Sequence, residues 1–235
     1  MSDSETLTKP EEKPHYHGHR QRLRERLLKS KLGSLPDYEI LELLLFPSHP
    51  RGDVKPLAKM LISQFGSFAK VITTDPEVLK KVPGVTDSVI TMLRMVQESA
   101  VRLIKDDITT QPILQSWKAL LDYCRATMGH LNTEQFRILY LNKQHMLIAD
   151  ELQEVGTIDR AAVYPREVVK RALVLEAAAI ILVHNHPGGN TKPSKADIDI
   201  TKQIMQAASV IGVELHDHLV VSSSSHYSFK SNGLI

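Results

Sequence analysis

The apolar run AIILVH, residues 179–184, constrains the fold of this chain most strongly. It is short, and its composition is typical of a strand buried on both faces. Other strand-like and helical segments alternate around it along the second half of the chain: strand-like at 136–142, 145–153, 213–223 and 226–235, helical at 165–178 and 194–211. Segments that alternate in this way pack as a sheet covered by helices, so we expect a three-layer α/β domain.

The first half of the chain has helical character alone. Helices are predicted at residues 37–46, 57–65 and 67–74, and residues 76–107 predict two helices joined by a tight turn at Pro83-Gly84. The second of these is amphipathic, with apolar residues at helical spacing: Val89, Met92, Leu93, Val96, Ala100 and Leu103. We therefore expect a disordered tail at 1–18, a helical domain at 19–107, a linker at 108–112 and the α/β domain at 113–235.

Composition restricts the classes of function. The net charge of +2 over 235 residues means that any nucleic-acid-binding signal must be local. The single cysteine, Cys124, excludes an intramolecular disulfide and a zinc site built from several cysteines, and it fits a reducing cytoplasm. No run of about 18 apolar residues and no apolar signal-peptide core occurs, so we expect a cytoplasmic protein with no membrane partner.

Residues 15–31, HYHGHRQRLRERLLKSK, form the most basic segment. One acid, Glu25, stands against six basic side chains: Arg20, Arg22, Arg24, Arg26, Lys29 and Lys31. Such a segment is either a solvated helix face or a phosphate-binding surface, and the sequence leaves both open.

The turn KVPGVTDSVI, residues 81–90, resembles a helix–hairpin–helix element. In that family the hairpin glycine and the free N–H groups of the second helix hold a nucleic-acid phosphate, which is consistent with the positive end of a helix dipole. The resemblance implies a DNA contact at Gly84, and the charge of the upstream basic segment makes Arg20, Arg22 and Arg24 further candidates for DNA contacts. The alternative is a plain helical hairpin used for packing or protein docking.

The stretch HNHPGGNTKPSKAD, residues 184–197, carries the strongest functional signal. His184 and His186 end the buried strand on one face, with Cα atoms about 6.6 Å apart, so their imidazoles can converge on one ion. Asp197 lies one turn into the following helix. Two histidines and a carboxylate make a three-ligand zinc set that leaves one position open, as catalytic sites do. Alternatively, Ser194 and Asp197 form a capping box, and the histidines bond to the backbone.

The whole pattern, H-x-H, seven residues, then S-x-x-D, resembles the JAMM motif of the MPN metalloprotease superfamily. The surrounding sequence resembles the bacterial RadC branch, also called UPF0758, strongly over residues 113–235 and more weakly over the helical half. One departure is Gly188, where this branch often has serine. The resemblance implies a cytidine-deaminase-like MPN fold with a mixed sheet, and one zinc ion per chain held by His184, His186 and Asp197.

The same resemblance implies roles for further residues. Ser194 would hydrogen-bond the activated water or the developing oxyanion. A glutamate upstream would act as general base and then general acid, and we expect Glu134 in this role because it precedes a Phe-led strand. Its competitors are Glu151, Glu154 and Glu167, and Glu134 could instead be a solvated residue. Asp217 and His218 either support the site or hydrogen-bond within the core.

Three hypotheses for function follow. The first is a zinc metallohydrolase that cleaves a peptide or isopeptide bond with an activated water. The alternative is a DNA-binding protein of repair or recombination whose zinc domain acts on DNA or on a DNA-bound partner. The third is a degenerate MPN domain that serves as a docking scaffold, and the intact ligand set argues against it. The identity of the polypeptide substrate and the oligomeric state stay open.

Overall fold

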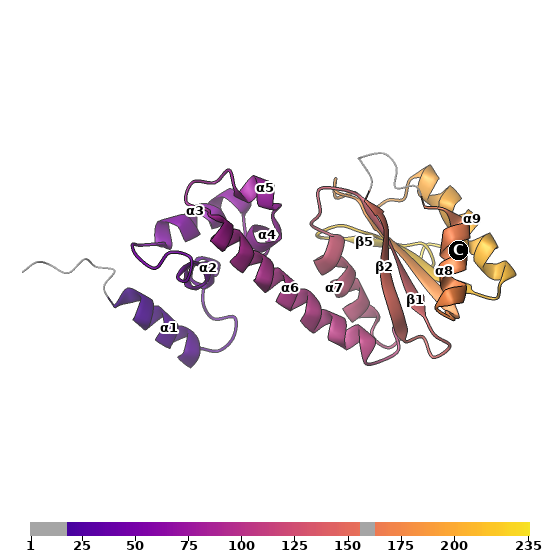
Figure 1. Ribbon diagram of the computed structural model, residues 1–235, viewed down its shortest axis with the longest axis horizontal. Helices are drawn as coiled ribbons and strands as arrows, with labels where there is room; N and C mark the ends of the chain where they lie inside the picture. Colours follow the sequence, from indigo (N-terminus) through magenta and orange to yellow (C-terminus); the bar gives the residue numbers. More distant parts are fainter. Residues whose placement is uncertain (1–17, 156–162) are drawn as a thin grey trace, which may run out of the picture. The chain divides into compact units, whose positions relative to one another are not determined.

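A computed structural model describes residues 18–155 and 163–235 of the chain (Figure 1). The predicted tail lies outside these residues, apart from Gly18. Two compact units make up the described part, one formed by the residues up to Ile72 with Lys80–Leu93, the other by Thr73–Leu79 with Arg94–Ile235. This division falls within the long helix α6 (Asp87–Thr109). The linker expected at 108–112 stays a prediction.

The first unit is helical. It contains α1 (His19–Lys29), α2 (Asp37–Leu45), α3 (Lys55–Phe65), most of α4 (Phe68–Thr73) and the start of α6. Four leucines and one alanine from α1, α2 and α3 contribute to its core, and they are fully or almost fully buried: Leu23, Leu41, Leu45, Ala58 and Leu61. The short α5 (Pro76–Leu79) precedes the Pro83-Gly84 turn, in which Gly84 has a left-handed φ of 86° that favours glycine.

The second unit is built on a sheet of five strands in the order β2-β1-β3-β4-β5. The strands are β1 (Gln135–Leu141), β2 (Leu147–Val155), β3 (Ala179–Asn185), β4 (Glu214–Val221) and β5 (His226–Ser228). β3 and β4 are parallel, and the other neighbours are antiparallel. The expected mixed sheet is therefore confirmed.

Helices cover both faces of this sheet (Figure 1). α7 (Trp117–Met128) packs on one face, while α8 (Pro165–Val174) and α9 (Lys195–Val210) pack on the other. Side chains of β3 alternate between the two cores: Ile181 and Val183 face α7, and Ile180 and Leu182 face α8 and α9. Burial of each such side chain contributes about 1.5–3 kcal/mol. The three-layer prediction is confirmed.

The helix predicted at residues 165–178 is wrong at its C-terminal end, because α8 ends at Val174. Glu176 takes a left-handed φ of 52°, and the N–H of Ala177 donates to the carbonyl of Ala172. This turn closes the helix so that the chain can enter β3 at Ala179. Among the described residues, no helix has the length and apolar content needed to cross a membrane.

The strand directions fix which residues share an edge of the sheet. β3 and β4 end at the same edge, and β1 begins there, since Phe136 pairs with His184. The opposite edge holds the β1–β2 turn and the start of β4, where Ala179 pairs with both Leu141 and Glu214. The predicted metal ligands lie at the first of these edges.

Candidate metal centre

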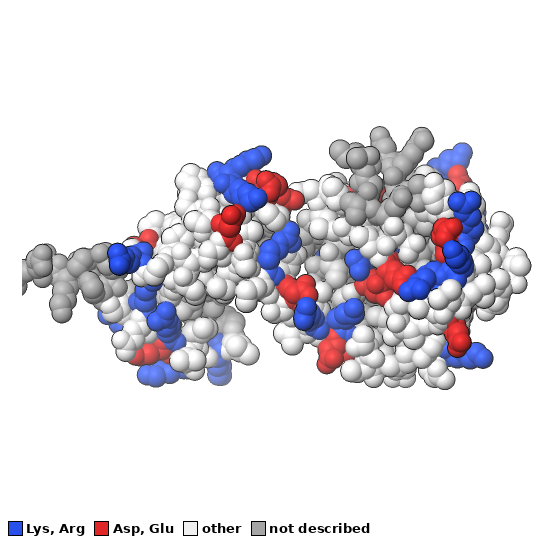
Figure 2. Space-filling model, viewed as in Figure 1, with Lys and Arg blue, Asp and Glu red and all other residues white. Residues whose placement is uncertain are grey.

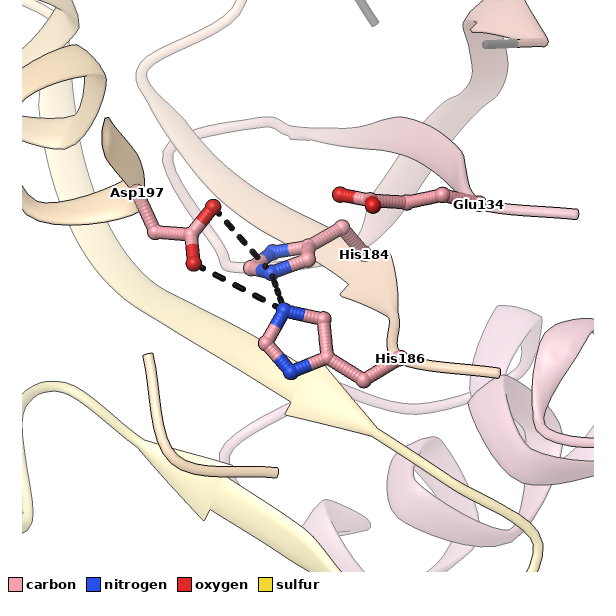
Figure 3. A group of neighbouring side chains, drawn as sticks. All are labelled: Glu134, His184, His186 and Asp197. Atoms are coloured by element: carbon pink, nitrogen blue, oxygen red, sulfur yellow. Dashed lines mark hydrogen bonds and ion pairs between the residues drawn. The ribbon is translucent and has the colours of Figure 1, made fainter. Parts of the chain in front are cut away.

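Four side chains from three parts of the second unit meet at the end of β3 (Figure 3). Their possible ligand atoms all lie within 4.8 Å of one another: Glu134, His184, His186 and Asp197. His184 Nε2 lies 3.1 Å from His186 Nε2, and Asp197 Oδ1 and Oδ2 lie 3.4 Å and 3.6 Å from these two nitrogens. The structure thus brings together the three residues predicted to bind the metal.

The helix that supplies Asp197 begins with a capping box. Ser194 is the N-cap of α9, its Oγ accepts from the N–H of Asp197 at 3.2 Å, and Asp197 Oδ2 accepts from the N–H of Ser194 at 2.6 Å. Ser194 and Asp197 therefore form the capping box that was the alternative to metal binding, and this capping box is compatible with metal binding. The cap holds the Asp197 carboxylate in place, while both of its oxygens also face the histidines.

Each histidine has its other ring nitrogen bonded on the side away from the cluster. His186 Nδ1 lies 2.7 Å from the carbonyl oxygen of Asn190, and because a carbonyl only accepts, Nδ1 carries the proton. The Nε2 atom of neutral His186 therefore presents a lone pair to Asp197 and His184. The hydrogen bond to the backbone, which was the alternative to metal binding for His186, therefore orients this ring toward the cluster.

A buried chain of hydrogen bonds orients His184 in the same way. The Thr201 hydroxyl donates to the carbonyl of Asp197, so its oxygen accepts from His218 Nδ1 at 2.6 Å. His218 Nε2 is then an acceptor for His184 Nδ1 at 2.7 Å. Burial, the largest cause, holds the pKa of His218 well below its usual value, so this ring stays neutral.

The electrostatics of the cluster match this arrangement. Burial raises the pKa of the Asp197 carboxyl, but the interactions with His184 and His186 outweigh it and hold this pKa well below its usual range. The contact with Asp197 raises the pKa of His186 above its ordinary value, against the effect of burial. An ionised carboxylate and two imidazole lone pairs that converge require a proton or a cation between them. Two nitrogens and one carboxylate oxygen are a donor set that zinc accepts, so these residues fit a zinc-type ion.

Glu134 immediately precedes β1 and points toward the other three side chains, with no direct interaction drawn between it and them (Figure 3). Asn185 lies between the two histidines in sequence, and its side chain is fully buried. Its Oδ1 accepts from the N–H of Gln135 at 2.8 Å, and its Nδ2 donates to the carbonyl of Thr133 at 3.1 Å. Asn185 thus ties the segment carrying Glu134 to the strand carrying the histidines.

An open pocket of about 510 Å³ adjoins the cluster. Glu134 and His186 line it together with Asn132, Pro187, Gly188, Asn190 and Lys192. Gly188 therefore lies at the pocket wall, where the resemblance would place serine, and a Cβ there would meet no heavy atom within 4 Å. The pocket leaves room for a ligand beside Glu134 and His186.

The competitors of Glu134 lie elsewhere or outside the described part. Glu151 on β2 pairs with Arg171, with Nε to both carboxylate oxygens at 2.9 Å. Glu167 on α8 is exposed and lies near Arg166 and Lys170. The side chain of Glu154 lies outside the described residues.

The four residues predicted to contact DNA belong to the helical unit and differ in their exposure and contacts. Arg20 donates to the carbonyls at the end of α2 and in the loop beyond it, Phe46, His49, Pro50 and Gly52, at 2.5–3.5 Å. Arg22 and Arg24 are exposed in α1, in a region where basic side chains show at the surface (Figure 2). The carbonyl of Gly84 lies 3.2 Å from His49 Nε2. DNA binding stays a prediction.

Two other residues named in the sequence analysis, Asp217 and Cys124, are buried within the fold. Asp217 accepts from the Ser228 hydroxyl at 2.6 Å and from the N–H of Lys230 at 2.9 Å, so it fixes β5 to β4. Cys124 is buried, and this burial raises the pKa of its thiol well above the usual range, which disfavours the reactive thiolate. Thr201 and Asn185 were missed as supporting residues. Their burial is seen only in the structure, and the one sequence signal was the position of Asn185 between two predicted ligands.

Comparison with known proteins agrees with this geometry. Residues 114–234 match the family model described as a RadC-like JAB domain. The chain is 51% identical to a UPF0758 protein of Ruegeria pomeroyi over 217 residues, which covers 92% of this chain and 97% of the relative. It is 52% identical to a UPF0758 protein of Rhodobacter capsulatus over 213 residues, covering 91% and 100% of the two chains.

Proposed function

From the premise that the chain belongs to the RadC, or UPF0758, family and carries its JAB domain, we propose that it is a zinc-dependent hydrolase of peptide or isopeptide bonds. The observation that carries this proposal is the convergence of His184, His186 and Asp197 beside a fourth acidic residue, Glu134. Three protein ligands leave an open position for a reacting molecule. A docking scaffold would not need that set of oriented donors.

In this proposal each side chain has a separate task. His184, His186 and Asp197 hold the ion, which when bound lowers the pKa of a coordinated water and polarises a carbonyl. Glu134, at the pocket wall, accepts the proton of the attacking water and returns it to the leaving amine. The Ser194 oxygen already accepts one hydrogen bond in the capping box, so its own proton is available to donate to a developing oxyanion.

The direct test combines metal content with turnover. Elemental analysis of the native protein is expected to give at least one zinc ion per chain, and one zinc ion fewer in the His184→Ala/His186→Ala variant and in Asp197→Asn. Glu134→Gln is expected to keep the zinc and to lose about 10²- to 10⁴-fold in the turnover of a cleaved peptide or isopeptide substrate. Glu151→Gln is the matched control, because its carboxylate pairs with Arg171 outside the cluster.

Two outcomes would contradict the proposal. A native protein that binds no zinc, even after zinc is added, would remove the hydrolase mechanism and favour a scaffold. Full activity in Glu134→Gln would move the general base to another residue. The readouts are independent, since ligand loss changes metal content and base loss does not.

DNA binding is a second candidate function, and it concerns the helical unit. The exposed Arg22 and Arg24 on α1 favour it, because exposed guanidinium groups can bind phosphates without reading sequence. In that case the metal domain would act on DNA or on a protein bound to DNA. Binding of a DNA duplex should then weaken steeply as salt rises, because counterions are released on complex formation.

A further inference from the structure

A second cluster of metal-ligand side chains lies at the other edge of the sheet, away from the centre just described. We propose that His145, Glu214 and His216 form a second site for a divalent transition-metal ion, which links the β1–β2 turn to the start of β4. Their possible ligand atoms all lie within 4.8 Å of one another. This proposal is independent of the hydrolase function, because it uses none of the residues of the first centre.

The strongest indication is an unsatisfied nitrogen on His216. This residue is only 7% exposed, and its Nδ1 atom makes no hydrogen bond with any described residue. Nδ1 lies 3.4 Å from Glu214 Oε1, close enough for both to bind one ion but without a hydrogen bond between them. The ion-pair contact with Glu214 satisfies this buried nitrogen only in part, and a cation bound by both atoms would satisfy it fully.

A bulge in β4 gives His216 its direction. Ile180 pairs with Leu215 and Ile181 pairs with Asp217, so His216 is an extra residue with no partner on β3. Bulges re-aim side chains at sheet ends. The His216 ring lies on the α7 side of the sheet, where its centroid is 6.1 Å from that of Trp117.

The β1–β2 turn brings His145 to the same place. His145 has a left-handed φ of 59°, a conformation that non-glycine residues rarely adopt. Asn142 stabilises the turn, since its Oδ1 accepts from the N–H groups of Gln144 and Met146 at 2.9 Å and 3.0 Å. The ring centroids of His145 and His216 are 5.8 Å apart. A locked turn reduces the ordering that metal binding would require.

The chemistry of the three residues selects the class of ion. Burial, and then the charge of Lys230, lowers the pKa of His216, which favours the neutral imidazole that can act as a ligand. Two imidazoles and one carboxylate suit zinc, cobalt, nickel or copper, whereas magnesium and calcium require mainly oxygen ligands. The positive charge of Lys230 opposes any cation here, and the Glu214 carboxylate offsets it.

The only tryptophan of the chain, Trp117, is a built-in reporter for this site. Co²⁺ has an open d shell and quenches a nearby indole, whereas Zn²⁺ has a filled shell and does not. Titration of the metal-free, full-length protein with Co²⁺ is expected to quench the tryptophan fluorescence saturably. Addition of Zn²⁺ should restore the fluorescence by displacing Co²⁺.

Variants locate the quenching ion. His145→Asn removes one ligand and preserves the turn, because asparagine tolerates the left-handed conformation. His145→Asn and Glu214→Gln should each lower the Co²⁺ affinity measured by quenching by at least about 10- to 100-fold. This is the loss expected when a residue that only supports a metal ligand is removed, and loss of a ligand costs no less. The His184→Ala/His186→Ala variant should keep the quench, since these residues lie at the opposite edge of the sheet. Thermal unfolding verifies that each variant folds.

Three results would overturn the second site. The first is the absence of saturable quenching in the native protein. The second is an unchanged Co²⁺ affinity in His145→Asn and Glu214→Gln. The third is loss of the quench in His184→Ala/His186→Ala, which would assign the signal to the first centre. Failure of the hydrolase proposal would leave all of these readouts unaffected.

Discussion

His184 Nδ1 lies 2.7 Å from His218 Nε2, and this contact determines which nitrogen of His184 faces the candidate metal centre. The direction of the bond follows from Thr201, whose hydroxyl donates to a carbonyl and so accepts from His218. His184 therefore carries its proton on Nδ1 and turns the lone pair of Nε2 toward Asp197. A ring held in this way has the correct tautomer before any ion arrives.

Replacement of His218 should weaken zinc binding although His218 is not a ligand. His218→Phe keeps a ring to stack on Phe229, which lies 4.5 Å away between centroids, but it removes the acceptor for His184 Nδ1. We expect an affinity loss of about 10- to 100-fold, measured by competition with a chelating dye. His226→Gln, a substitution of the exposed histidine that contacts Arg125, should bind zinc normally. Native affinity in His218→Phe would exclude the orienting role.

Thr201 offers a finer test of the same chain of bonds. Thr201→Val has nearly the same shape but no hydroxyl, so His218 Nδ1 loses its acceptor in a fully buried position. The variant should lose about 1–3 kcal/mol of folding free energy and bind zinc more weakly. Thr201→Ser restores the hydroxyl and should recover zinc affinity. If the serine variant stays as weak as the valine variant, packing of the methyl group, and not the hydrogen bond, explains the effect.

The clustering of His184, His186 and Asp197 could be predicted from sequence because the three candidate ligands belong to one continuous strand–loop–helix segment. Within such a segment, spacing determines geometry: the strand places His184 beside His186, and the capping box places Asp197. For His218 the sequence leaves open whether the side chain supports the site or hydrogen-bonds within the core, because its partner His184 is 34 residues away. No local spacing reports such a contact.

The same reasoning explains what was missed. Asn185 lies between two predicted ligands, but its partners Thr133 and Gln135 are 52 and 50 residues away. The alternating segments predicted the layers of the fold, whereas the bulge at His216 depends on how β4 aligns with β3. The end of α8 was also misplaced, because helix-forming residues continue past the point at which the chain must turn into the sheet.

Asn185 is expected to affect turnover more than metal binding. Asn185→Asp keeps an acceptor for the N–H of Gln135 but cannot donate to the carbonyl of Thr133, so the backbone beside Glu134 loses one of its two ties. Because misplacement of a catalytic group by about 1 Å can cost about 100-fold in rate, we expect a large fall in kcat with one zinc ion retained at this centre. Elemental analysis and kinetics on the same preparation measure both. Loss of zinc in parallel with activity would instead give Asn185 a role in holding the histidines.

The arginines of α1 should separate into a structural residue and DNA-binding candidates. Arg20 satisfies several backbone carbonyls and lies over the Phe46 ring at 4.8 Å, so Arg20→Gln should destabilise the helical unit by about 1–3 kcal/mol in denaturant unfolding. Arg22→Gln is exposed and should change stability by less than about 0.5 kcal/mol. If α1 binds DNA, the Arg22→Gln/Arg24→Gln variant should bind a duplex more weakly, and the slope of log K against log salt should become shallower by about 0.9 for each phosphate that the variant no longer neutralises. An unchanged slope and affinity in this folded double variant would show that α1 does not bind DNA through these residues.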